Sequence, residues 1–214
     1  MKTPAPPPAP SPALGARLDR ILGRIIEPGF LARTGLGNEI ACHIFDYPAE
    51  EELAVRAHTA WLRARLASHH PELRVLHLNL LDTALAYLRA RNLLDRTLEM
   101  QRTKGPEAAL KALRGPLSAE RLRDFIAETH APASYDLIIL DGIGSIWPLV
   151  RAHSLLSALH TVIDHTPLIL FYPGVFDGIT LRLFGRIAPA DNATGPGARP
   201  YYRGFILVPH GAQP

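Results

Sequence analysis

Cysteine and long apolar runs are both scarce in this chain of 214 residues. A single cysteine, Cys42, cannot form a disulfide within the chain, which fits a reducing compartment. No run of about 18 apolar residues occurs, so we expect no transmembrane helix. The first twelve residues also lack the apolar middle of a secretory signal. Together these absences predict a cytoplasmic protein with no membrane contact.

The residues that are present suffice for a folded domain, since 47% are hydrophobic and 20% are charged. A chain of this length buries roughly 70% of its unfolded surface, so it needs no metal or disulfide to fold. The net charge of +3 first suggests nucleic-acid binding, but the charge is unevenly distributed. Residues 53–123 contain 13 Lys or Arg against 6 Asp or Glu, whereas residues 46–52 contain four acids and no base. Arginines at helical spacing beside Ala and Leu are typical of a solvated helix face, so DNA contact through them is kept as an alternative.

Local patterns divide the chain into an arm, a domain and a tail. Six prolines among the first twelve residues predict a disordered arm at residues 1–13, followed by one domain at 14–209 and a tail at 210–214. Apolar periodicity predicts helices at residues 14–30, 53–68, 81–100, 106–130, 148–163 and 179–184. Short β-prone runs predict strands at 40–45, 73–80, 135–141, 167–172 and 201–209, with a turn-rich segment at 188–200. The alternation predicts an α/β fold whose mainly parallel five-stranded sheet has helices on both faces, as in RecA-like and Rossmann-like folds.

Polar and glycine residues collect where the predicted strands end. Ligands of such sheets bind beyond the carboxyl ends of the strands, so this edge is the best candidate surface. In chain order the residues there are Asp46, Tyr47, Pro48, Asn79, Asp141, Gly142, Gly144, Ser145, Tyr172, Pro173, Gly174 and Asp177.

A nucleotide site is the first hypothesis for this edge. The run LIILDG, residues 137–142, is similar to the strand and terminal aspartate that hold Mg²⁺ in phosphate-loop ATPases. However, the chain contains no GxxxxGK[ST] motif, and the first strand is followed by DYPAEEE. Phosphate binding needs converging N–H donors and a lysine, whereas three glutamates and a proline repel an anion and remove a donor. We therefore predict no bound nucleotide cofactor and no ATP hydrolysis.

The hypotheses of a metal site and of a catalytic nucleophile are no better supported than the nucleotide hypothesis. Asp46, Asp141 and Asp177 could together hold Mg²⁺, but acids at strand ends are common, and helix caps account for two of them. His153 and His160 are seven residues apart, beyond the usual spacing of zinc ligands. Ser145 lies in GIGSI and not in the GxSxG motif of hydrolases. The residues thus predict neither a metal site nor a catalytic residue.

Aromatic and arginine residues gather near the end of the chain. Tyr and Arg often anchor protein interfaces, although alternate aromatics of a strand also belong to cores. Adding these residues to the carboxyl-edge set yields a list of candidate partner-binding residues. They are Asp46, Tyr47, Asp141, Ser145, Tyr172, Asp177, Arg182, Tyr202 and Arg203.

Long, unusual blocks of this sequence resemble the BrxB family of BREX (bacteriophage exclusion) defence systems. The blocks are GNEI…FDYP, LDGIGSxxPxxRxH and FYPGxFDGxxLRLFG, and the resemblance covers residues 14–209. It implies a role in phage defence beside the DNA methyltransferase PglX, the large ATPase BrxC and the phosphatase-fold protein PglZ. It carries over no catalytic residues, because none is established for the family.

The resemblance and the missing motifs lead to one interpretation. We expect a non-catalytic component of an anti-phage complex that acts through protein–protein contact, with a PglZ-type protein as its partner and PglX or BrxC as further components. The alternative is a nucleotide- or nucleic-acid-binding factor of the same system. Contact with DNA is possible, and we expect it to be indirect.

Overall fold

A central, mainly parallel β-sheet organises the protein. The computed structural model describes residues 8–27, 29–31, 40–186 and 202–211, with the backbone alone at 40, 41, 202 and 203. The strand order is β2-β3-β4-β1-β6, and all four neighbouring pairs in this order are parallel. β5 pairs antiparallel with β4. The predicted α/β fold is thereby confirmed. The strands are β1 (Ile40–Tyr47), β2 (Val75–Asn79), β3 (Leu137–Asp141), β4 (Leu168–Phe176), β5 (Leu181–Leu183) and β6 (Tyr202–Ile206).

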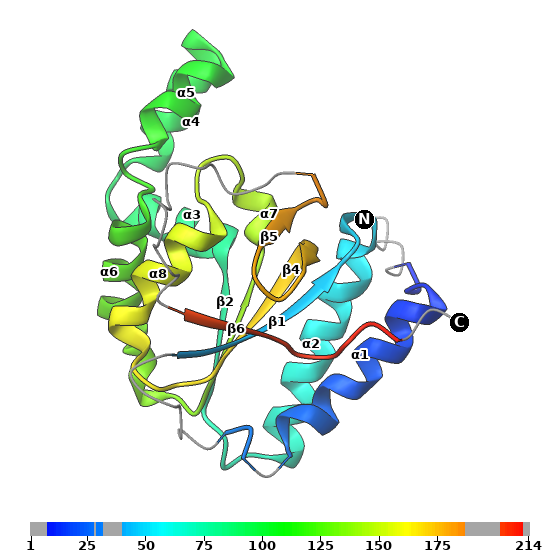
Figure 1. Cartoon of the computed structure of the whole chain (residues 1–214). Coiled ribbons are helices and arrows are strands. Elements are labelled where there is room, and N and C mark those ends of the chain that lie inside the picture. The colour runs from blue at the N-terminus through cyan, green and yellow to red at the C-terminus, as the bar shows by residue number, and fades with distance from the viewer. Residues whose placement is uncertain (1–7, 28, 32–39, 187–201, 212–214) are drawn as a thin grey trace, which may run out of the picture.

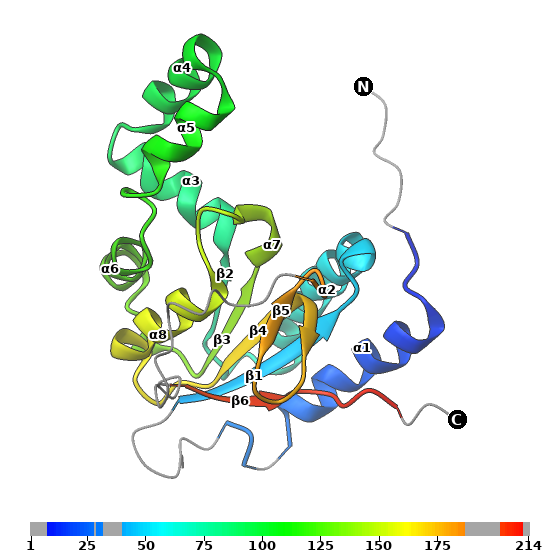
Figure 2. The same cartoon turned by 45° about the horizontal axis from the view of Figure 1, so that its top comes forward.

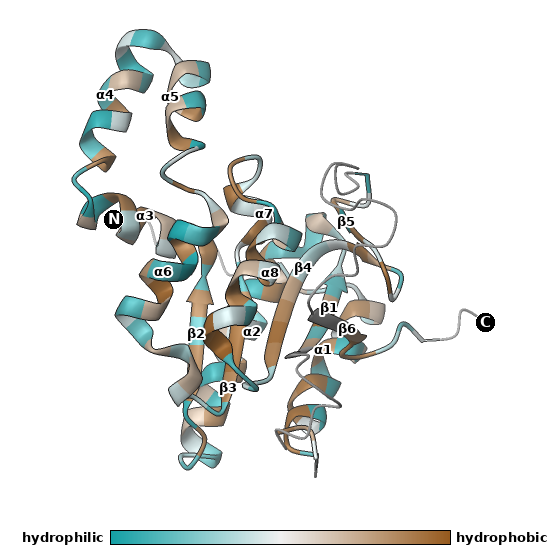
Figure 3. Ribbon diagram, turned by 60° about the vertical axis from the view of Figure 1, so that its left-hand side comes forward, coloured by the Kyte–Doolittle hydropathy of each residue, from teal (hydrophilic) through white to brown (hydrophobic). Residues whose placement is uncertain are grey.

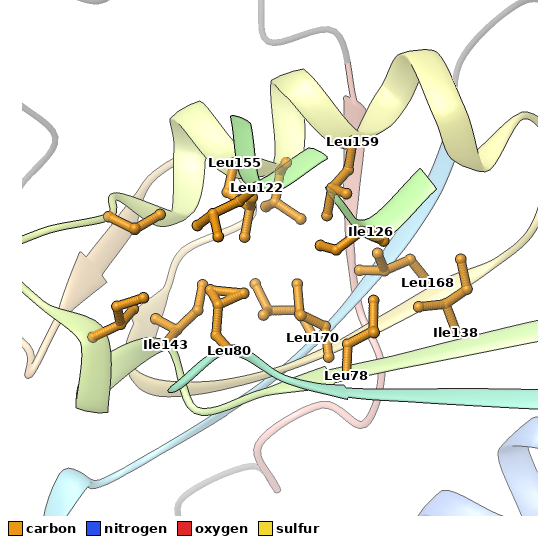
Figure 4. Packing of buried hydrophobic residues seen from close by; sticks show 14 of the residues in the cluster. Leu78, Leu80, Leu122, Ile126, Ile138, Ile143, Leu155, Leu159, Leu168 and Leu170 are labelled. Atoms are coloured by element: carbon orange, nitrogen blue, oxygen red, sulfur yellow. The ribbon is translucent and has the colours of Figure 1, made fainter. Parts of the chain in front are cut away.

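Helices cover both faces of this sheet (Figure 1). α1 (Pro12–Ile25) and α2 (Glu52–His69) lie on one face, and α3 (Leu80–Ala90), α6 (Ala119–His130) and α8 (Ala152–Ile163) lie on the other. Each face encloses its own hydrophobic cluster, because successive strand side chains point to opposite faces. On the α6 and α8 face, leucine and isoleucine side chains interdigitate between the helices and the strands, as Figure 4 shows.

The connections leave the sheet on opposite faces. β1 leads through α2 to β2, three positions away, whereas β2 leads through α3 and α6 back to its neighbour β3. Connections that run in opposite directions must use opposite faces if both crossovers are right-handed, which is the strongly preferred hand. The carboxyl edge therefore contains a topological switch point, where the β1–α2 connection and the β3–α7 connection leave the sheet in different directions; α7 spans Ile143–Ile146.

The long helical region after β2 is divided more finely than predicted. Four helices replace the two expected at 81–100 and 106–130: α3, α4 (Leu94–Lys104), α5 (Pro106–Leu113) and α6. Asn92 adopts a positive φ of 54° that ends the first run, and Gly105, with φ 85°, forms the turn between α4 and α5. α4 and α5 form a hairpin that projects from the body of the molecule (Figure 2).

The segment after β4 corrects another prediction. A helix was expected at 179–184, and β4 was expected to end before Pro173 and Gly174, but β4 continues to Phe176 and turns back into β5. The Asp177 carboxylate accepts hydrogen bonds from the backbone N–H groups of Ile179 (3.0 Å) and Thr180 (2.7 Å), which stabilises the turn. Leu181 and Leu183 then alternate into the core, a strand pattern too short to recognise in sequence.

Several boundaries also differ from the predicted ones. α1 begins at Pro12, two residues before the expected domain start, and the Ser11 side chain caps it. The helix expected from residue 148 begins at Ala152, and the Trp147-Pro148 peptide bond before it is cis. The remaining short elements are 3₁₀ turns at Ala49–Glu51 and Pro132–Ser134.

Two predicted features lie wholly or partly outside the described residues. They are the proline-rich arm, of which residues 1–7 are not described, and the turn-rich segment at 188–200. Within the described part of the chain, no helix has both the length and the apolar character needed to cross a membrane.

His43 makes stability sensitive to acid. Its ring lies between Phe30 and Phe205, with ring centroids 4.3 and 5.6 Å away. Burial, and secondly the nearby Arg24 charge, lower the pKa of His43 from 6.5 to about 4. The unfolded chain therefore binds a proton that the folded chain rejects between these pH values. Stability is fully present above pH 6.5 and falls as the pH drops towards 4.

We expect this group to contribute a loss of about 3 kcal/mol over that range. Urea unfolding at pH 7 and pH 4.5 checks the prediction, with His43→Leu as the reference, because other groups also titrate in acid. The wild type should lose more stability than His43→Leu. Equal losses in the two proteins would contradict the assignment.

Candidate functional site

A chain of hydrogen bonds joins three elements at the carboxyl edge of the sheet. At the end of β1, the buried Tyr47 hydroxyl donates to Glu52 Oε2 at 2.6 Å. Glu52 Oε1 accepts from Arg56 Nε at 2.7 Å, and an Arg56 NH2 group donates to Ser145 Oγ at 2.7 Å. These hydrogen bonds thereby join the β1–α2 connection to α7, at the point where the connections leave the sheet in different directions. The Asp46 carboxylate is not part of this chain, because it points into the core and accepts a hydrogen bond from Arg17 of α1.

The pKa values of Tyr47 and Arg56 in this hydrogen-bond chain are both raised. Burial, and secondly the neighbouring Glu52 charge, raise the pKa of Tyr47 far above its ordinary value of 10. The hydrogen bond to Glu52 raises the pKa of the Arg56 guanidinium further. Ser145 Oγ accepts from a cation and contacts no base among the described residues, so nothing there prepares it as a nucleophile. The arrangement holds the ends of β1, α2 and α7 together.

Asp141 is the centre of a second polar group at the end of β3. Asp141 Oδ1 accepts from Asn79 Nδ2 at 2.7 Å, and Asp141 Oδ2 lies 2.8 Å from His77 Nε2. Asn79 also caps α3 by accepting from the Asp82 N–H at 3.2 Å. Gly142 follows with a φ of 76°, and a Cβ there would lie 2.7 Å from the Asn79 amide nitrogen. The positive φ at this position, together with the nearby Asn79 side chain, thus favours glycine.

Asp46 belongs to a different, buried ion pair. Its carboxylate accepts from Arg17 NH2 at 2.9 Å, lies 2.8 Å from His210 Nε2, and accepts from the Phe176 N–H at 3.1 Å. Arg17 also donates to the carbonyl oxygens of Asp46 and Val208. The side chains of Arg17 and Asp46 are only 8% and 3% exposed. This group ties α1, β1, β4 and the C-terminal segment together, including His210 of the predicted tail.

The three aspartates considered for a metal site are not brought together. Asp46 lies on β1 and Asp141 on β3, with β4 between them, and Asp177 lies in the turn of the β4–β5 hairpin. In the described ranges, no group of three His, Cys, Asp or Glu side chains is placed to hold a metal ion.

The β4–β5 hairpin presents an exposed, mainly apolar surface at the carboxyl edge. Arg182 lies 3.8 Å from Asp177, and its cross-strand neighbour is the exposed Val175. Backbone hydrogen bonds from Thr180 and Ile179 lower the pKa of Asp177, so its carboxylate stays charged. We call the exposed set the hairpin surface, and it consists of Trp147, Val175, Asp177, Ile179, Arg182 and Phe184.

Two aromatic residues extend the hairpin surface towards α7. The rings of Trp147 and Phe184 meet edge to face at 6.2 Å, yet remain 43% and 37% exposed. Phe184 adopts a φ of 55°, which is uncommon for a bulky residue, and its N–H donates to the Pro173 carbonyl at 2.9 Å. Sequence reasoning did not select Trp147, whose only signal is an aromatic residue within a polar turn.

The structure narrows the list of candidate partner-binding residues. Four of them are buried: Asp46, Tyr47, Asp141 and Tyr172. Three are exposed: Ser145, Asp177 and Arg182. The backbones of Tyr202 and Arg203 belong to β6, but their side chains lie outside the described part.

Comparison with known proteins identifies relatives over nearly the whole chain. A family model described as "BREX protein BrxB" matches residues 76–207. A BREX protein BrxB of Escherichia coli O9:H4 (strain HS) is 41% identical over 198 residues, which cover 92% of this chain and 93% of the relative. A BREX protein BrxB of Bacillus cereus (strain H3081.97) is 34% identical over 197 residues, which cover 91% and 97%. No solved structure shows significant similarity to the chain. The chain therefore belongs to the BrxB family of BREX proteins.

Proposed function

We propose that this BrxB protein is a non-catalytic interaction subunit of its phage-defence system and that it binds a PglZ-type protein through the hairpin surface. Family membership implies the role in phage defence. The observation that carries the interaction is the exposure of Trp147, Val175, Ile179 and Phe184 around one ion pair. Apolar side chains gathered on a surface and bordered by charges are typical of protein interfaces.

The chemistry of the hairpin surface favours a protein partner. Ile179 is 87% exposed at the tip of the hairpin, so the described residues leave its apolar side chain almost uncovered. Trp147 and Arg182 are residue types that often dominate binding free energy. The Asp177–Arg182 pair offers one charge of each sign, which suits the orientation of a complementary surface better than attraction to a polyanion.

Charge reversal at Arg182 tests this function. Arg182→Glu places two carboxylates together beside the apolar residues, so we expect the affinity for the PglZ-type protein to fall about tenfold or more. The fold should persist, because the Arg182 side chain is 46% exposed and its ion pair with Asp177 is also exposed. Ile179→Asp should weaken the complex similarly. Co-purification and titration by calorimetry would measure the effect, with circular dichroism to check folding.

Arg102→Glu is the matched control, because Arg102 is also exposed and also pairs with an acid, Glu99, but on the distant helix α4. It should leave the affinity unchanged. Equal losses in Arg182→Glu and Arg102→Glu would show a mere effect of net charge. Absence of any complex for the wild type, together with salt-sensitive DNA binding, would favour the nucleic-acid alternative and overturn the proposal.

A further inference from the structure

A second surface lies at the opposite end of the strand order from β6. β2 is an edge strand, paired only with β3 in the described part of the chain (Figure 3). The Arg74 carbonyl accepts hydrogen bonds from Asp136 and Leu137, so Arg74 points its backbone groups at β3. Backbone groups alternate in direction along a strand, so those of Val75 and His77 point to the open edge. The edge therefore offers backbone donors and acceptors to another strand.

The sequence of β2 does nothing to block such pairing. Natural proteins protect open edges with lysine, proline, a bulge or a covering element. β2 reads VLHLN, which contains no lysine, arginine, acidic residue or proline, and its pairing with β3 runs in register without a bulge. An edge of this composition is suited to strand addition.

A groove lies beside the start of this edge, between Val75 of β2 and helix α2. Its volume is about 450 Å³. Three alanines of α2, spaced at four and three residues, form one wall, so the groove has room for side chains of another chain. Its lining residues are Ala60, Arg63, Ala64, Ala67, Leu73 and Val75.

The charge at the groove indicates what kind of strand fits. Arg63 lines the groove, is exposed, and forms no ion pair with any described residue. The nearby Arg74 is held by Asp136 in a paired contact of 2.9 and 3.1 Å, so its charge is already matched. The β2 strand of a second copy of this chain contains no acidic residue that could face Arg63, whereas an acidic residue of another protein would neutralise its charge.

We infer that the β2 edge binds an extended segment of a partner protein by strand addition. The segment pairs its backbone with Val75 and His77, places apolar side chains at alternate positions into the alanine-lined groove, and faces Arg63 with an aspartate or glutamate. This surface is separate from the hairpin surface and does not depend on the function proposed for it.

Fifteen-residue peptides that tile the other proteins of the same defence system test this inference. Peptides that bind the full chain should alternate apolar residues and carry an acid. Val75→Pro should weaken them about fivefold, because it removes an edge N–H that the fold does not use. Ala64→Trp fills the groove and should abolish binding. Arg63→Glu should weaken binding about tenfold, whereas Arg65→Glu, on the same helix but outside the groove, should not.

Each result of these binding measurements either supports strand addition at the β2 edge or contradicts it. Fluorescence anisotropy gives the affinities, and thermal unfolding shows which variants stay folded. If Val75→Pro unfolds, Ala64→Trp and Arg63→Glu carry the test, since both positions are exposed on α2. The inference is overturned if no peptide binds, or if binding survives both of these changes. It is also overturned if the free chain is a dimer that Ala64→Trp dissociates, because the occupant would then be a second copy.

Discussion

Replacing Asp46 with alanine is expected to destabilise the protein by about 3–5 kcal/mol. The substitution leaves the Arg17 guanidinium buried against the Val208 carbonyl and the Phe45 ring, whose centroid is 4.5 Å away, with no opposing charge. It also removes the acceptor of the Phe176 N–H. An uncompensated buried charge costs far more than the loss of an exposed ion pair. Urea unfolding at pH 7 measures the change.

Two further variants separate the causes of this loss. His210→Ala removes a partly exposed contact of the same carboxylate and should cost less than about 1 kcal/mol. Arg17→Met combined with Asp46→Asn removes both charges but keeps an acceptor for Phe176. We expect this double variant to be more stable than the sum of the single changes predicts, by about 1–3 kcal/mol. Additive losses would show that the pair does not act as a unit.

Replacing Gly174 with alanine is expected to separate β5 from β4. The added Cβ would lie 2.2 Å from the Arg182 carbonyl oxygen and 3.0 Å from the Phe184 nitrogen. Both atoms are backbone, so no side chain can rotate away and the hairpin itself must move. We expect a loss of about 2–3 kcal/mol in the free energy of unfolding, with a disturbed hairpin surface. Weaker binding of the PglZ-type protein should accompany it.

Gly115→Ala is the control for this change, because no atom lies within 4 Å of the added Cβ. It should shift stability by no more than about 0.5 kcal/mol. Thermal unfolding of both variants, with partner titration, checks the prediction. A Gly174→Ala protein as stable as the wild type would mean that the hairpin adapts and is not held by this close contact.

Patterns that depend on neighbours in sequence predicted most of the fold. Four apolar residues before Asp141 predicted a buried strand, and the apolar periodicity of residues 53–68 predicted α2. These signals succeed because periodicity and capping act within a few residues. Long sequence blocks also predicted the BrxB family, which the comparisons confirmed.

The candidate sites depended on contacts that no local pattern contains. Arg17, Asp46 and His210 are far apart in the chain, and only the packing of α1 against β1 and the C-terminal segment makes them one buried group. Tyr172 was predicted at a partner surface but is buried, since β4 continues past it and β5 turns back over it. By itself, then, the sequence determined the fold class, the family and the absence of a phosphate-loop motif. Tertiary structure alone decided which polar residues are buried in pairs and which remain exposed, because both burial and charge pairing arise between segments distant in the chain.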